Sequence, residues 1–384
     1  MCKRLIIAGL MSGWLLLISG AVEAYSYGYI NSTLRPGDSG NGCGGCHGPL
    51  PGVVEVELQG DAAILPGATA RYEVIISNIT NTSALAGFTS AIDKRPGIQP
   101  VFKNVQGEPT TTADSSTQIV NTNASFPLKA PVNAVAIHLI DLTMPANAGY
   151  GERYTIYTVG EAGWAGRQVG WRHAANFTVT VAPPVPAALT ADQVNATDTF
   201  IPLQWIGSPQ GEHFRVLARA DDYPDSPNDA AASLVYEGAD ISADATGLAP
   251  GQAYYFAVWG KSPDADIYSA DAALATAATV PGSPDSLIAT PRSQTEIALA
   301  WTGSSDEYRL LRRINTCPSS PADGNATLVY EGHNDSITDD GLGFDVEYCY
   351  RVWGKVINRD VFSETSAQVI WIDRIYFDRL ESSP

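Results

Sequence analysis

The sequence predicts an all-β protein with three tandem β-sandwich domains, which follow a signal peptide and a leader rich in Gly and Pro. Its 384 residues are 45% apolar and 17% charged, which is sufficient for several separate cores. Gly 35, Pro 25 and Tyr 17, against three Met, favour short strands and tight turns over helices. A repeat with a period of 94 residues, the length of one β-sandwich, indicates the same fold class.

The N-terminal segment predicts export. Lys3 and Arg4 form a short basic region, residues 5–22 are apolar apart from Gly and Ser, and Ala24 ends a small-x-small site after which we expect cleavage. An uncleaved anchor is the alternative, although this stretch is at the short end of spanning length. No later segment is long and uncharged enough to cross a bilayer, so we expect the mature chain in the periplasm, on the cell surface or outside the cell, where disulfides persist.

The net charge argues against nucleic acid as a partner. With 41 acidic and 23 basic side chains, the formal charge is -18 at pH 7. Nucleic-acid binding depends on Lys and Arg side chains that neutralise phosphates, and a strongly acidic chain disfavours such binding. An anionic lipid surface would repel it for the same reason.

The leader, residues 25–49, carries the motif Cys43-x-x-Cys46-His47. This is the attachment signature of c-type haem, because two thiols at this spacing reach the two vinyl groups and the next imidazole reaches the iron. We therefore predict one covalent haem c with His47 as the proximal ligand. Three alternatives stay open. A redox dithiol requires a helix N-terminus to lower the pKa of its first thiol, and a zinc site requires further ligands. The third is a strained disulfide between Cys43 and Cys46.

A second axial ligand would come from further along the chain. We favour His173, which follows a Trp and an Arg that suit the edge and the propionate of a haem. His138, within a strand-like run, and Met144, at the end of that run, are the next candidates. We expect His213 and His333 on the surface of the repeats. A five-coordinate iron is the remaining possibility.

Residues 50–182 predict the first sandwich. Apolar side chains alternate with other residues over 54–59, 72–77 and 177–181. A period of two is that of a strand with one buried face. A Pro-Gly pair at 66–67 provides a turn between the first two of these strands.

Residues 184–280 and 282–373 predict two copies of one module. The pentapeptide LVYEG at 234–238 recurs 94 residues later, as does the tetrapeptide VWGK at 258–261. A Pro-rich segment precedes each copy and marks its boundary. The C-terminal tail, residues 374–384, follows the second copy.

Aromatic residues recur at matching places in the two copies. Each copy has an early strand with a Trp, and Tyr254 and Tyr348 have the spacing of a tyrosine corner, in which the phenol bonds back to the corner's backbone. With these features, residues 184–373 resemble tandem fibronectin type III modules of the bacterial kind. The resemblance implies one sandwich per copy, but this fold hosts many tasks and does not identify one.

Cys2 lies in the signal segment, and the second copy contains the other two cysteines, Cys317 and Cys349. We predict a structural disulfide between them, and a free, reactive pair is the alternative. The positions 94 residues earlier hold Tyr223 and Tyr255. We therefore expect an aromatic contact in the first copy where the second has a covalent bond.

The leader and the first sandwich together resemble exported bacterial reelin-like domains of the choice-of-anchor type. The resemblance rests on Cys43, Cys46 and His47 shortly after the signal peptide, on the Pro-Gly turn, and on the Ala-Gly-Phe run at 86–88. It implies an exported β-sandwich that follows the haem motif. Asn121 stands where related members have a histidine, so the resemblance supplies no second axial ligand.

Two functional hypotheses follow. In the first, the chain is an exported monohaem c-type protein that transfers electrons to a redox protein or senses a small ligand through its iron. In the second, it is a non-enzymatic adhesion or structural protein whose sandwich modules bind a cell-surface component. We expect no enzymatic activity, since the sequence has no hydrolase or nucleotide-binding motif.

Overall fold

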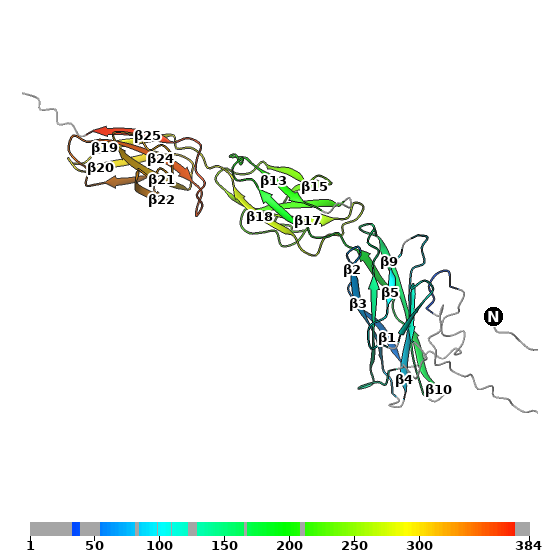
Figure 1. Cartoon of the computed structure of the whole chain (residues 1–384). Helices are drawn as coiled ribbons and strands as arrows, with labels where there is room; N and C mark the ends of the chain where they lie inside the picture. The colour runs from blue at the N-terminus through cyan, green and yellow to red at the C-terminus, as the bar shows by residue number, and fades with distance from the viewer. Residues whose placement is uncertain are drawn as a thin grey trace, which may run out of the picture. The chain divides into compact units, whose positions relative to one another are not determined.

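The computed structural model describes residues 33–38, 54–80, 84–97, 99–108, 110–121, 129–164, 167–207 and 212–372. The regular elements in these ranges are the strands β1 to β25 (Figure 1). The predicted all-β class with tandem β-sandwich domains is thus confirmed. The signal peptide, the haem motif Cys43, Cys46 and His47, and the C-terminal tail lie outside the described residues.

The chain divides into two compact units, Met1–Val181 and Ala182–Pro384. The first unit contains one sandwich, and the second contains the two repeated modules. Within the described ranges, no helix is both long and apolar enough to cross a bilayer.

The first sandwich has a four-stranded sheet, β1-β3-β8-β5, and a seven-stranded sheet, β2-β11-β9-β4-β7-β6, in which β10 also pairs with β9. The strands are β1 (Glu55–Gly60), β2 (Ala63–Ile64), β3 (Thr69–Ser77), β4 (Leu85–Ile92), β5 (Val101–Lys103), β6 (Thr110–Ala113), β7 (Gln118–Asn121), β8 (Ala136–Thr143), β9 (Arg153–Trp164), β10 (Arg167–His173) and β11 (Phe177–Val181).

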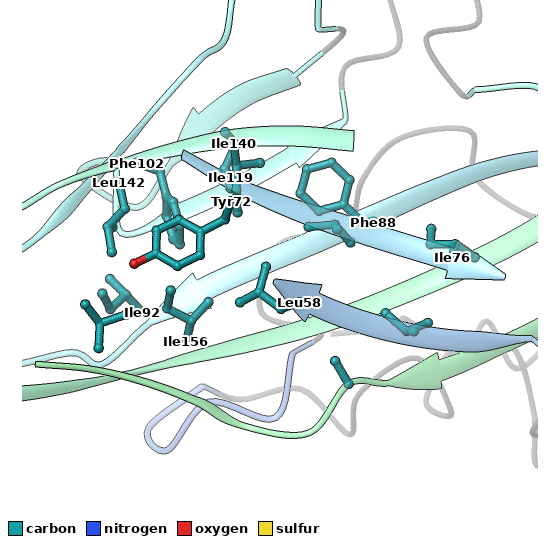
Figure 2. Close-up of a cluster of buried hydrophobic side chains, with 14 of the residues drawn as sticks. Leu58, Tyr72, Ile76, Phe88, Ile92, Phe102, Ile119, Ile140, Leu142 and Ile156 are labelled. Carbon is teal, nitrogen blue, oxygen red and sulfur yellow. The ribbon is translucent and has the colours of Figure 1, made fainter. Parts of the chain in front are cut away.

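The core of this domain lies between the two sheets and follows the predicted alternation. On β1, Val56 and Leu58 are buried while Glu55 and Glu57 are exposed. The Tyr72 hydroxyl donates to the Asp61 carbonyl over 2.7 Å, which satisfies the polar end of a fully buried ring. Figure 2 shows side chains from both sheets that meet in this core, namely Leu58, Tyr72, Ile76, Phe88, Ile92, Phe102, Ile119, Ile140, Leu142 and Ile156.

Each repeated module packs a three-stranded sheet against a four-stranded sheet, in the orders β12-β13-β16 and β15-β14-β17-β18, then β19-β20-β23 and β22-β21-β24-β25. The first module has β12 (Ala188–Ala191), β13 (Phe200–Ile206), β14 (His213–Arg219), β15 (Ser233–Gly238), β16 (Ser242–Thr246), β17 (Ala253–Lys261) and β18 (Ala273–Ala278). The second has β19 (Ser286–Pro291), β20 (Ile297–Thr302), β21 (Glu307–Ile314), β22 (Thr327–Gly332), β23 (Ser336–Asp339), β24 (Glu347–Lys355) and β25 (Ala367–Ile372).

The two modules are built alike, as expected of fibronectin type III-like units. Trp205 and Trp301 are each buried in the core of their own module. The Ala249 N–H donates to the Tyr254 hydroxyl over 2.9 Å, which is the predicted tyrosine corner. The Tyr348 hydroxyl accepts the corresponding bond, over 2.8 Å, from a glycine N–H in the second module.

The predicted disulfide is present in the second module. Cys317 and Cys349 are bonded, with their Cα atoms 4.8 Å apart. At the matching place in the first module, the rings of Tyr223 and Tyr255 pack edge to face with centroids 5.1 Å apart. Both predictions for this position are therefore confirmed.

Candidate functional site

Two of the predicted second haem ligands, His138 and Met144, lie inside the first sandwich. His138 is fully buried on β8, where its Nε2 atom lies 3.1 Å from the Ala86 carbonyl oxygen. Its ring packs against Phe88, with centroids 4.9 Å apart. Met144 follows β8 and belongs to the same apolar core. Neither side chain presents a donor atom to the surface.

The surroundings of His138 make it a neutral, structural histidine at physiological pH. A carbonyl only accepts hydrogen bonds, so Nε2 carries the ring proton and Nδ1 is an acceptor. Nδ1 lies 3.8 Å from Oε2 of Glu108, and neither atom has a hydrogen-bond partner among the described residues. Burial lowers the pKa of His138 to about 4, and the nearby charge of Lys129 acts in the same direction.

His173 is placed differently from the other two candidates. It ends β10 and is only partly buried. Burial lowers the pKa of His173, so its imidazole is neutral at physiological pH and keeps a lone pair for a metal. The Trp171 ring lies edge-on to it at 5.6 Å between centroids. The Trp171 indole N–H is shielded from solvent and has no acceptor in the part of the chain that the structure describes.

Strand register places His173 on the face of the seven-stranded sheet that is turned away from the core. His173 pairs with Val159, Val159 with Thr89, and Thr89 with Val120. Directly opposed residues in antiparallel strands point to the same face. Val159 and Val120 are buried, yet they are not part of the core cluster. We call this surface the outer face; it comprises Thr89, Ala91, Gln118, Val120, Tyr157, Val159, Trp171 and His173.

Arg35, in the leader, is bound to the sandwich beside this face. Its side chain has no exposed surface. Nη1 donates to the Ile92 carbonyl and to the Thr117 hydroxyl, each over 3.0 Å. Nη2 donates to carboxylate oxygens of Asp38 and Asp114, each over 2.8 Å. Ile92 ends β4 and Thr117 precedes β7, so one guanidinium joins the leader to both strands. We call these five residues the Arg35 clamp.

Charges around the clamp favour its ionised form. Lys94, 2.9 Å from Asp114, and then Arg35 lower the pKa of Asp114 to about 2. Burial raises the pKa of Tyr157, and so does Asp93, while the charge of Arg35 acts in the opposite direction. Tyr157 belongs to the outer face, so Arg35 lies close enough to that face for its charge to act there.

The sequence analysis did not single out Arg35, although a local signal was present. Arg35-Pro36-Gly37-Asp38 forms a turn in which the Asp38 N–H donates to the Arg35 carbonyl over 3.1 Å. Gly37 has a φ of 88°, which glycine adopts without strain. A Pro-Gly turn flanked by Arg and Asp brings the two charged side chains together, as found here.

Solved structures of fibronectin type III domains are similar to this chain at low sequence identity. No family model and no curated protein matches the sequence. A two-domain fibronectin type III segment of chicken tenascin is 18% identical, with a TM-score of 0.33 over 49% of this chain and 99% of that chain. The FN1–FN3 domains of chicken CNTN1 are 10% identical, with a TM-score of 0.26 over 84% of this chain and 100% of that chain. Similarities at this level carry no argument about function.

Proposed function

We propose that the protein is an exported, non-enzymatic scaffold that acts at the cell surface or outside the cell, with a cell-surface component as its partner. The observation that carries this proposal is the duplicated sandwich module, one copy of which is closed by the Cys317–Cys349 disulfide. Disulfides persist in oxidising compartments. Two sandwiches that each have a core of their own can act as spacers. Because their strands match, they offer a binding partner the same kind of surface twice.

Cell fractionation tests this proposal. An epitope-tagged full-length chain in its native host should be found outside the cytoplasm, with Cys317 and Cys349 joined in peptide mass spectra. Deleting the gene should weaken attachment of cells to a surface, and the full-length chain should restore it. As a control, a variant without residues 1–24 should stay in the cytoplasm with both thiols reduced. Cytoplasmic retention of the full-length chain, or unchanged attachment in the deletion strain, would contradict the proposal.

We also propose that the leader carries one covalent haem c, which would make the scaffold an electron carrier or a sensor. The motif Cys43-x-x-Cys46-His47 favours this second function. In the first domain, His173 at the end of β10 is partly buried and offers an imidazole as a candidate second ligand. A bound haem would supply one-electron chemistry or a site for a small ligand.

An absorption spectrum and a mass measurement test haem attachment. The full-length chain, produced in a host with a haem-attachment system, should show a sharp reduced α-band and the mass of one added haem. Replacing both cysteines, Cys43→Ala with Cys46→Ala, should remove both signals, whereas the control His213→Ala should keep them. A colourless product with both cysteines free or joined to each other would leave only the scaffold function.

A further inference from the structure

The chain is rich in the tripeptide Asn-x-Ser/Thr, which is the acceptor motif for N-linked glycans. Half of its 16 asparagines begin such a tripeptide without a central Pro, namely Asn31, Asn78, Asn81, Asn123, Asn176, Asn195, Asn325 and Asn334. Ser and Thr are 57 of the 384 residues, so chance would produce only about two such tripeptides. This excess separates the motif from the isolated matches that many sequences contain.

The structure places the described acceptor tripeptides on the surface, beside the ends of strands. Five of the eight asparagines are described, and each of them is exposed: Asn78, Asn176, Asn195, Asn325 and Asn334. The other three lie outside the described residues. Exposed turns at strand ends are where a bulky, polar modification can be attached without disturbing a core.

The side-chain amide is the group that would be modified, and its surroundings differ among these residues. The Asn195 amide nitrogen donates to an Asp192 carboxylate oxygen over 2.7 Å. In Asn325 and Asn334 it is the backbone N–H that is bound, to Asp323 Oδ1 over 2.9 Å and to the Tyr330 hydroxyl over 2.7 Å. The turns at 325 and 334 are thus held through the backbone, and their exposed side chains are the better acceptors.

Asn325 and Asn334 lie at opposite ends of β22, which is an edge strand. Asn325 comes two residues before Thr327, the first residue of β22, and Asn334 comes two residues after its last residue. In the order β22-β21-β24-β25, β22 pairs with β21 on one side only. Leu328, on this strand, is 57% exposed. An open edge with an apolar side chain is a template for pairing with another chain unless something covers it.

We propose that the protein is N-glycosylated, that Asn325 and Asn334 are acceptors, and that their glycans shield the edge of β22. This inference rests on the first proposed function, because the acceptor motif is used in exported chains. In the transfer, the side-chain amide nitrogen attacks the anomeric carbon of a glycan carried on a polyprenyl diphosphate. A C–N bond forms, and the bond from the anomeric carbon to the diphosphate oxygen breaks. Polyprenyl diphosphate leaves, and the amide proton passes to a base of the host transferase.

Glycopeptide mass spectrometry on the full-length chain from its native host tests the acceptors. Peptides with Asn325 and Asn334 should carry the mass of a glycan, whereas Asn133 and Asn147, which are exposed but begin no acceptor tripeptide, should be unmodified. Thr327→Ala should abolish modification of Asn325, and Thr327→Ser should keep it. Modification that survives in Thr327→Ala, or that also occurs at Asn133, would overturn the motif as its cause.

The first module contains a matched turn without the motif. Asp240 lies 94 residues before Asn334, and its N–H donates to the Tyr236 hydroxyl over 2.7 Å, as that of Asn334 does to Tyr330. Ser242 stands two residues further on. Asp240→Asn should therefore add one glycan to the first module, and combining it with Ser242→Ala should remove that glycan again. An unmodified Asp240→Asn chain would show that this turn is not an acceptor.

Self-association tests the shielding of β22. Asn325→Gln with Asn334→Gln should make the exported full-length chain self-associate on concentration, as measured by light scattering. Adding Leu328→Lys should restore the monomer, because a charged edge opposes pairing. A double variant that stays as monomeric as the wild type would overturn the shielding role.

The outcomes also separate this inference from the function on which it rests. An exported chain with the Cys317–Cys349 disulfide formed but with Asn325 and Asn334 unmodified would overturn the glycosylation and leave the first proposed function standing. Retention of the full-length chain in the cytoplasm would overturn both.

Discussion

Replacing Arg35 with methionine should lower the free energy of unfolding of the first domain by about 3 kcal/mol. The Arg35 side chain is 0% exposed and that of Asp38 only 2%, so the substitution leaves a buried carboxylate without its counter-charge. Asp38 Oδ2 already has no hydrogen-bond partner among the described residues, and little else can compensate for the loss. Hydrogen exchange of β4 and β7 peptides, measured by mass spectrometry on the full chain, reports this loss.

An exposed partner of the same carboxylate provides the control. Lys94 also binds Asp114, but its side chain is 46% exposed, so Lys94→Met should cost at most about 1 kcal/mol. Combining Arg35→Met with Asp38→Asn should cost less than Arg35→Met alone, because the amide carries no charge. Equal losses for Arg35→Met and Lys94→Met would show that the guanidinium is not a buried clamp.

The clamp should also weaken in acid. Lys94 and Arg35 hold the pKa of Asp114 at about 2, below its ordinary value of 3.8. A carboxyl group whose pKa is lowered by folding contributes stability that is present above about pH 4 and lost as the pH falls towards 2. Exchange protection of β7 should therefore decline across that range, and Asp114→Asn should make the decline shallower.

The modules could be predicted from the sequence because their signals are local and repeated. LVYEG and VWGK each recur after 94 residues, and each pair occupies matching strands, β15 with β22 and β17 with β24. The same 94-residue offset aligns Tyr223 and Tyr255 with Cys317 and Cys349. A contact expected in one copy therefore predicts a contact between the aligned residues of the other. Alternation of apolar and polar residues fixed the buried face of β1 in the same way.

The Arg35 clamp and the facing of the histidines could not be predicted. The partners of Arg35 on β4 and before β7 are 57 and 82 residues away, and a Gly-rich leader has no periodic pattern that records such contacts. On β8, His138 shares its face with the apolar Ile140 and Leu142, but Ile137 and Leu139 on the other face are apolar too, so alternation alone does not fix which face is buried. His138 points inwards because the Ala86 carbonyl of the opposite sheet accepts its N–H.

Removing the disulfide with Cys317→Ala and Cys349→Ala should lower the free energy of unfolding of the second module by about 3–4 kcal/mol. The bonded residues are 32 positions apart, so the bond removes a large loop from the unfolded ensemble. In the folded module it fastens the segment after β21 to β24, a strand at the centre of the four-stranded sheet. Exchange of β24 peptides in the full chain measures the loss.

The first module supplies the matched comparison, because the Tyr223–Tyr255 contact occupies the same position without a covalent bond. Tyr223→Ala removes an aromatic pair, which is worth about 1 kcal/mol beyond its buried area, and does not alter loop closure in the unfolded chain. Its effect should be seen at β17 and should be unchanged by a reducing agent, whereas β24 of the wild type should lose protection on reduction. If reduction left the exchange protection of β24 unchanged, the disulfide would stabilise the second module no more than the tyrosine pair stabilises the first.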